Sequence, residues 1–247
     1  MREKGIPIAE VGLSQMTEQE WLTQTENPLE MIWFLGDRAS ARKLRLYACG
    51  CFRRIWHLAS PETRKIIEVA ERLADGLARP REVGAARRAP HQKSEDDRNP
   101  TWEAAENALD RNAQEAARIT PAEVAMLVGA LALPPGSTAY FPFSVPLECD
   151  AAMASEVKLQ VDLLRDNFGN PFRPEPVLDS AWLSWNRGAI GKLAQSIYDE
   201  RSFSDLPILA DALEEAGCTD PSILEHCRGP GPHCRGCWVV DQILGKK

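Results

Sequence analysis

Residues 40–58 read SARKLRLYACGCFRRIWHL, and this stretch decides the fold class. Its apolar residues recur at intervals of three and four, which places them on one face of a helix; they are Leu44, Tyr47, Ala48, Cys51, Ile55 and Leu58. Ser40 precedes them and is a good N-cap, because its hydroxyl can accept a hydrogen bond from a free backbone amide. The stretch predicts an amphipathic helix over about 41–58 with one buried face.

The same helix signals recur on both sides of this stretch. Hydroxyl or amide side chains predict helix starts at Thr17, Asn27, Ser60, Thr101 and Thr120. Beyond residue 150 the pattern predicts a helix from about 152 to 167, and then short helices over about 179–186, 188–201, 205–216, 221–228 and 236–244. Apolar residues almost never alternate with a period of two, so strands are not expected. The sequence therefore predicts an all-α fold, an irregular multi-helix bundle, with a solenoid of paired short helices as the weaker alternative.

Composition divides the chain into four segments. We expect a flexible leader over 1–15, an N-terminal helical segment over 16–78, a polar linker or loop over 79–100, and a C-terminal helical segment over 101–247 that packs with 16–78 as one domain. The third segment contains three prolines among charges of both signs, which is typical of a linker or loop. Prolines and a glycine over 134–150 predict a second loop.

The overall composition is that of a globular protein and excludes several classes. Of the 247 residues, 44% are hydrophobic and 26% are charged, so the chain has the apolar material for a core. No apolar run approaches the roughly 18 residues that cross a bilayer, and no secretory signal opens the chain. The seven cysteines are an odd number, which argues against complete disulfide pairing. These features predict a cytoplasmic protein with reduced thiols and no membrane partner.

Charge is segregated along the chain, although the net charge is −7. Segment 38–54 holds six basic residues and no acid, whereas segment 190–226 holds eight acids and two basic residues. Several interpretations stay open: the two segments neutralise each other, the basic face is simply solvated, or it contacts nucleic acid or an acidic protein partner. A nucleic-acid contact would use Arg42, Arg45, Arg53 and Arg54, but the acidic composition makes it the less expected interpretation.

Cysteine and histidine concentrate in a Gly/Pro-rich turn near the C-terminus. The turn reads HCRGPGPHCRGC from His226 to Cys237, and Cys234 has the spacing at which it and Cys237 can share one metal ion. The glycines permit the backbone angles that such a turn requires. His226 or Cys227, together with His233, would supply the further nitrogen or sulfur donors that zinc takes.

Two other uses of these side chains stay open. Cysteine is among the most buried residue types, so core packing alone is the simplest interpretation, and it is the expected one for Cys51. A redox or catalytic thiol would need a lowered pKa, for instance near a helix start, and Cys237 directly precedes the last predicted helix. A structural metal, core packing and thiol chemistry are thus three hypotheses for the turn.

Five segments of the sequence match a pattern shared by a protein family: MTEQEWL at 16–22, the basic stretch 42–57, FGNPFRP at 168–174, IYDER at 197–201, and 209–241. They resemble a large family of uncharacterised proteins that is multiplied in planctomycete bacteria. The resemblance covers about 16–78 and 157–245, and it implies a start of the common region near Met16 but no activity.

Two cysteine positions depart from this family pattern. Cys234 stands where the family has another residue, and Phe52 stands where the family has a cysteine. The resemblance therefore implies that a shared metal site does not need Cys234. The remaining candidate ligands are His226, Cys227, His233 and Cys237, with Cys51 or Cys218 as further candidates.

The sequence contains no motif that fixes a reaction, because it lacks a nucleophile elbow, a phosphate-binding glycine loop and a dinucleotide fingerprint. We expect a helical protein-interaction or adaptor module in the cytoplasm, with a protein partner and a structural zinc knuckle. A metal-dependent or thiol enzyme that uses the His226–Cys237 segment is the first alternative. A regulator that contacts nucleic acid through the basic segment 38–54 is the second.

Overall fold

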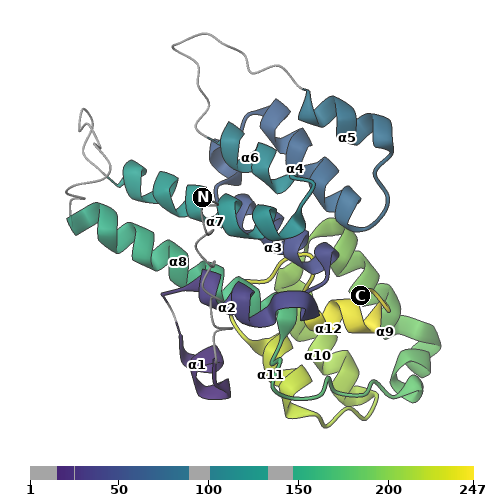
Figure 1. The fold of residues 1–247 in the computed structure, drawn as a ribbon. Coiled ribbons are helices and arrows are strands. Elements are labelled where there is room, and N and C mark those ends of the chain that lie inside the picture. The colour runs from purple at the N-terminus through teal and green to yellow at the C-terminus, as the bar shows by residue number, and fades with distance from the viewer. Residues whose placement is uncertain (1–15, 25, 89–100, 133–146) are drawn as a thin grey trace, which may run out of the picture.

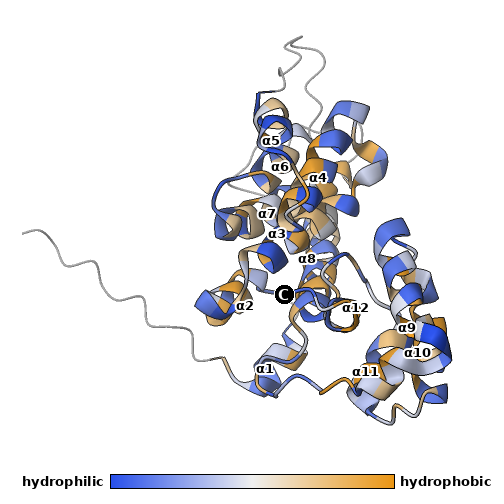
Figure 2. Cartoon of the chain, turned by 90° about the vertical axis from the view of Figure 1, so that its right-hand side faces the viewer, coloured by the Kyte–Doolittle hydropathy of each residue, from blue (hydrophilic) through white to orange (hydrophobic). Residues whose placement is uncertain are grey.

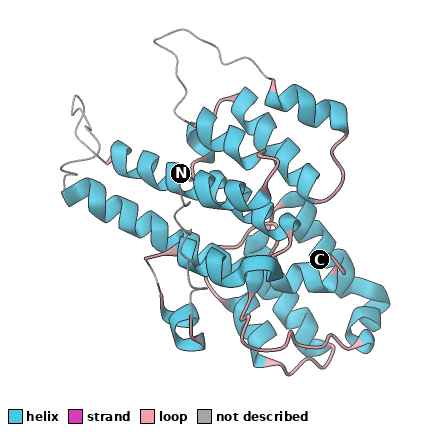
Figure 3. Ribbon diagram, in the orientation of Figure 1, coloured by secondary structure: helices cyan, strands magenta, loops and turns pink. Residues whose placement is uncertain are grey.

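A computed structural model describes residues 16–24, 26–88, 101–132 and 147–247. These residues form twelve α-helices and no strand, which confirms the predicted all-α fold (Figure 3). The helices are α1 (Glu18–Thr23), α2 (Pro28–Leu35), α3 (Ala41–Arg53), α4 (Pro61–Ala74), α5 (Pro80–Arg87), α6 (Trp102–Ala108), α7 (Ala113–Leu131), α8 (Leu147–Phe168), α9 (Ser180–Glu200), α10 (Leu206–Glu215), α11 (Pro221–Arg228) and α12 (Trp238–Ile243).

Side-chain caps start the first helices where the sequence predicts them. Thr17 and Glu20 form a capping box at the start of α1, and the side chains of Asn27, Ser40 and Ser60 each accept a hydrogen bond from the amide three residues on. Each bond satisfies one of the amides that a helix start leaves without a backbone partner. The predicted starts of α1 to α4 are therefore confirmed.

Helices α1 to α8 form the N-terminal bundle, and α3 lies at its centre (Figure 1). It packs against α4, α6, α7 and α8, and every residue from Leu44 to Phe52 is buried. One hydrophobic core joins it to α1, α2, α7 and α8, and another joins it to α4, α6 and α7. The prediction that only one face of this helix is buried is therefore wrong, because other helices surround α3 over Leu44–Phe52. The helix ends at Arg53, and a short 3-10 turn at Trp56–Leu58 follows it.

The last four helices form a unit with its own core. Ile197 of α9, Leu209 of α10, Ile223 of α11 and Val239 of α12 all belong to this core. Figure 2 shows α9, α10 and α11 grouped together, apart from α4 to α6. The α12 helix contacts both α8 and α9, and so connects the C-terminal unit to the bundle. Within α9 the backbone is not helical from Trp185 to Gly188, which agrees with two predicted helices there.

The predicted linker over 79–100 begins with a helix instead. The α5 helix places Pro80 in its first turn, where a missing amide hydrogen costs nothing. The Glu82 carboxylate accepts a hydrogen bond from the Arg79 amide, and Val83 is buried. The prediction of a linker over this part is therefore wrong: its polar composition is compatible with a short amphipathic helix. The remainder of this segment, 89–100, lies outside the described residues, as does the predicted leader 1–15.

Two further boundaries differ from the predictions. A single helix, α7, runs through Pro121, and its N-cap is Asn112 rather than Thr120. The Thr120 hydroxyl instead donates to the Ala104 carbonyl on α6, so tertiary contacts outweigh the local start signal. The predicted loop over 134–150 overlaps α8, which begins at Leu147, and the part over 134–146 lies outside the described residues.

Over the described ranges, each helix is too short or too polar to traverse a lipid bilayer.

Candidate metal centre

Asp166 lies two residues before the end of α8 and carries a side chain that is only 2% exposed. A carboxylate at this end of a helix faces the negative pole of the helix dipole, and burial adds a cost for its charge. A buried acid here needs positive or hydrogen-donating neighbours. Two histidines and one cysteine from the C-terminal unit supply that neighbourhood.

His226 reaches Asp166 from the last turn of α11. Its Nε2 atom lies 3.2 Å from Asp166 Oδ1 and 3.2 Å from the sulfur of Cys237. The ring also packs at 5.2 Å from the Trp238 ring, which restricts its orientation. One imidazole nitrogen therefore faces both the carboxylate and the thiol.

The loop between α11 and α12 supplies the other two side chains. His233 places Nδ1 2.7 Å from Asp166 Oδ1, while its Nε2 lies 3.4 Å from the Gly229 carbonyl oxygen. Cys237 ends the loop as the N-terminal flanking residue of α12. The two histidine rings meet edge to face, with centroids 5.1 Å apart.

One ligand atom from each of Asp166, His226, His233 and Cys237 lies within 4.8 Å of the other three. In a tetrahedral zinc site, bonds of 2.0–2.3 Å imply donor–donor separations of about 3.3–3.8 Å. The donor pairs at 3.2 Å are close to that range. The 2.7 Å pair of His233 Nδ1 and Asp166 Oδ1 is a direct hydrogen bond, and it would have to open while the wider pairs close when an ion binds. The group has two nitrogens, one sulfur and one oxygen, which is a donor set that zinc accepts.

The charges of the group depend on one another. Burial alone raises the pKa of the Asp166 carboxyl, but hydrogen bonds from His226 and then His233 outweigh burial and hold it at about 2. Burial opposes a charge on His233, yet the hydrogen bond to Asp166 raises the pKa of that ring. Burial, followed by the charge of Asp166, raises the pKa of the Cys237 thiol well above its ordinary value. Without a metal ion the thiol keeps its proton, and an ion bound by the thiolate would displace that proton.

Backbone groups orient the donors from outside. The amide of Cys234 donates to Asp166 Oδ2 at 2.9 Å, which leaves Oδ1 facing the two histidines. The Gly229 carbonyl lies beside His233 Nε2 and leaves Nδ1 for the centre. Such outer partners are typical of protein metal sites, where they fix the tautomer and direction of each ligand.

Three of the four ligands expected from the sequence come together here, namely His226, His233 and Cys237. Cys227 is not part of the group, because neighbouring residues on a helix point about 100° apart and His226 already faces Asp166. The Cys227 side chain belongs to the core of the C-terminal unit, where burial raises the pKa of its thiol to about 12. Asp166 takes the fourth place.

The Cys234 and Cys237 thiols do not converge. Cys234 belongs to the core around α3, and its sulfur accepts a hydrogen bond from the Asn167 side chain at 3.2 Å. Its backbone, rather than its thiol, supports the site. Cys51 and Cys218 are buried and lie outside the donor group as well, and all six cysteines with described side chains are free thiols.

Sequence reasoning missed Asp166, although the sequence carries a signal for it. The residue is an acid in the last turn of a predicted helix, where a carboxylate is disfavoured unless a cation or donor compensates. It stands 67 positions before His233, so no local spacing pattern includes both.

The four arginines of the predicted basic patch bind groups within the chain. Arg42 pairs with Asp75 and Asp241, and Arg45 donates to the carbonyls of Ala108 and Asp110. The other two pair with carboxylates: Arg53 with Glu71 on α4, and Arg54 with Glu156 on α8. Three of these four arginines thus pair with acids of the same chain, and those acids lie outside the acidic segment 190–226.

The fold and the donor group together define an all-α protein with a candidate metal centre. Comparison with protein-family models, with curated proteins and with solved structures finds no match.

Proposed function

We propose that this protein binds one zinc ion through Asp166, His226, His233 and Cys237, and that it acts as a helical protein-interaction module built around that ion. One observation carries the proposal: four donor atoms from α8, α11 and the following loop converge within 4.8 Å. The α8 helix is distant in sequence from α11 and the loop after it, so the tertiary fold brings the four donors together.

The donor types favour zinc over other common ions. Calcium and magnesium prefer sites made of oxygen atoms alone, whereas thiolate and imidazole ligands suit zinc and other late transition metals. Zinc accepts nitrogen, sulfur and carboxylate oxygen in one tetrahedral site. The mixed set of this centre fits that preference.

A structural role is favoured over a catalytic one. Structural zinc sites use four protein ligands, whereas catalytic sites keep one position open for water or substrate. The side chains of His226 and His233 are only 17% and 10% exposed, which restricts access to the ion. An ion held in this way would fasten α11 and α12 to α8. The surface that these three helices form together would then bind a protein partner in the cytoplasm.

The two alternative functions have weaker support. A thiol enzyme needs a thiol with a lowered pKa, whereas burial raises the pKa of Cys237. A nucleic-acid regulator needs free basic side chains, whereas Arg42, Arg45, Arg53 and Arg54 already bind carboxylates or carbonyls of the chain.

The first prediction concerns metal content and compares two cysteine variants. We expect the wild-type protein to hold about one zinc ion per chain, and Cys237→Ser to lose it together with thermal stability, because a donor is removed. Cys227→Ala is the matched control. Cys227 directly follows the proposed ligand His226 in α11, but its sulfur lies outside the donor group, so this variant should retain zinc. Elemental analysis after gel filtration measures both variants.

Cobalt substitution separates the structural from the catalytic alternative. Four protein ligands should give the visible spectrum of tetrahedral cobalt with a thiolate band, unchanged when small anions are added. Equal zinc content in Cys237→Ser and wild type would refute the proposal, and an exchangeable fourth position would favour the enzyme.

A further inference from the structure

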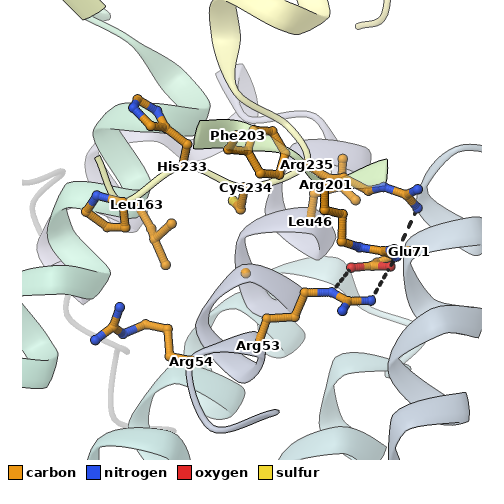
Figure 4. Close-up of a pocket in the computed structure, with 12 residues that line it drawn as sticks. Leu46, Arg53, Arg54, Glu71, Leu163, Arg201, Phe203, His233, Cys234 and Arg235 are labelled. Atoms are coloured by element: carbon orange, nitrogen blue, oxygen red, sulfur yellow. Dashed lines mark hydrogen bonds and ion pairs between the residues drawn. The ribbon is translucent and has the colours of Figure 1, made fainter. Parts of the chain in front are cut away.

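A cavity of about 300 Å³ lies beside the candidate metal centre, and His233 belongs to both. Residues of α3, α4 and α8 line it together with the 232–235 loop and the segment that follows α9 (Figure 4). Leu46, Leu163 and Phe203 give it an apolar wall. A space of this size holds a small organic molecule.

The charged side chains around this cavity are mostly positive. Four arginines line it, and Glu71 is the one carboxylate among its lining residues. We call three of the arginines, Arg53, Arg201 and Arg235, the arginine cluster because each forms an ion pair with Glu71. The cluster therefore carries two positive charges more than the carboxylate neutralises.

This excess charge is partly removed from water. The side chains of Arg53, Arg201 and Arg235 are only 21%, 29% and 14% exposed, and that of Glu71 is 2% exposed. The bond from Arg53 to Glu71 is bidentate, at 2.5 and 2.9 Å. Arg235 Nη1 lies 3.6 Å from the same carboxylate, while its other two nitrogens donate to the carbonyls of Tyr198 and Asp199. Within the described part of the chain, the buried Nε atom of Arg201 has no hydrogen-bond partner. Shielded charge that lacks a full set of partners favours an added anion.

The fourth arginine, Arg54, lies at the opposite side and is paired with a carboxylate of its own. Figure 4 shows the Arg53 and Arg54 side chains leaving α3 in opposite directions, with the arginine cluster and Glu71 on the Arg53 side. Arg54 bonds Glu156 through its Nε atom. The cavity thus has one strongly cationic side, and an apolar wall adjoins it.

We propose that this cavity binds a small organic phosphate, with the phosphate group at the arginine cluster and the carbon skeleton on the apolar wall. Guanidinium groups match phosphate oxygens in geometry and charge, and a phosphomonoester carries about two negative charges at neutral pH, as the excess of the cluster requires. A monocarboxylate would neutralise only half of that excess. The site is separate from the zinc ligands, except that His233 also borders the cavity.

A small ligand fits this geometry better than a nucleic acid. Nucleic-acid surfaces present exposed arginines along a track that follows the phosphate backbone. Here the arginines line one concave space, and three of them are tied to a single buried carboxylate.

Calorimetric titration with phenyl phosphate tests the proposal, on protein whose zinc content has first been measured. We expect one saturable site, no binding of phenol, and competition by inorganic phosphate. Arg201→Gln should weaken phenyl phosphate binding about tenfold or more, because a charge-assisted contact is lost. Arg228→Gln is the matched control, because Arg228 pairs with Asp211 and Glu214 on the exposed surface and should leave binding unchanged.

A second variant keeps the test decisive if Arg201→Gln does not fold. Phe203→Ala should weaken binding of phenyl phosphate but not that of inorganic phosphate, because only the phenyl ring contacts the apolar wall. Absence of saturable binding up to millimolar phenyl phosphate would overturn the proposal. Stronger, salt-dependent binding of a single-stranded oligonucleotide would also overturn it. Because zinc content is measured separately, failure here leaves the metal centre untouched, and the reverse also holds.

Discussion

Gly236 determines how closely the loop between α11 and α12 approaches the N-terminal bundle. Its φ angle of +98° lies in the region that favours glycine, and a Cβ atom there would come within 2.0 Å of the Asn167 side-chain oxygen and 3.2 Å of Leu46. The loop backbone therefore lies directly against α3 and α8. Lys43 reinforces this contact, because its ammonium group donates to the carbonyls of Asn167 and Gly236 at 2.7 and 2.8 Å.

We predict that Gly236→Ala destabilises the protein by about 2–4 kcal/mol, through the strain of a positive φ and overpacking of a filled site. The control is Gly76→Ala, at a φ of +70° with no atom within 4 Å of the added carbon. It should cost only about 1–2 kcal/mol, because strain alone remains. Urea denaturation followed by circular dichroism measures both. Equal losses in the two variants would contradict the close approach at Gly236.

The candidate site could be predicted from the sequence only as far as local spacing extends. His226, His233 and Cys237 lie within one short turn, so the sequence indicates them together. The choice between Cys227 and Asp166 depends on which way α11 faces and on how α8 lies against it. Those are tertiary relations, which a spacing pattern does not contain.

At the scale of elements, α3 is a central helix whose charged side chains act as connectors. Arg42 shows this most clearly: it donates to Asp75 beyond α4, to Tyr198 on α9 and to Asp241 on α12, at distances of 2.6–2.9 Å. Its side chain is 12% exposed, and those of the two aspartates are 3% and 2% exposed. One guanidinium thus joins the N-terminal bundle to the C-terminal unit.

We predict that Arg42→Gln lowers the free energy of unfolding by about 3 kcal/mol, the lower end of the cost of breaking a buried ion pair, because Asp241 keeps Lys43 and Asp75 keeps Tyr198 as partners. Arg228→Gln breaks ion pairs with Asp211 and Glu214, whose side chains are 67% and 58% exposed. This control should cost less than about 1 kcal/mol. Denaturant titration of the two variants compares them, and similar losses would show that Arg42 is not a connector.

Helix positions were predictable from the sequence where caps and apolar spacing agree, as at Ser40 and Ser60. They were not predictable where tertiary contacts decide. Thr120 is a good local start signal, yet its hydroxyl bonds α6 and the helix continues through Pro121. The buried charges on α3 were also unpredictable, because their partners come from distant parts of the chain.

At the scale of the whole molecule, the candidate metal centre lies where two differently built parts meet. Asp166 belongs to α8 of the bundle, whereas His226, His233 and Cys237 belong to the C-terminal unit. The α10 and α11 helices pack on each other within that unit. An ion at this centre would therefore stabilise the packing of the C-terminal unit against the N-terminal bundle more than the interior of either one.

If the proposed zinc ion is bound, we predict that its removal with a chelator increases amide hydrogen exchange chiefly in α11, α12 and the loop between them. Protection in α3 and α7 should change little, because their packing does not involve the ion. Mass spectrometry of peptides measures the exchange, and Cys237→Ser without chelator should give the same pattern. A uniform increase over all described helices would contradict the location of the effect.

The long stretch of sequence between Asp166 and His233 has a consequence for the stability of the chain. His233 follows Asp166 by 67 positions, so an ion that bound both would close a long loop. For a disulfide, closing a loop of this length removes chain entropy worth about 4 kcal/mol from the denatured ensemble. An ion that binds only the assembled centre would leave on unfolding, so it would stabilise the chain by mass action instead, and its free concentration relative to its dissociation constant would set the gain in stability.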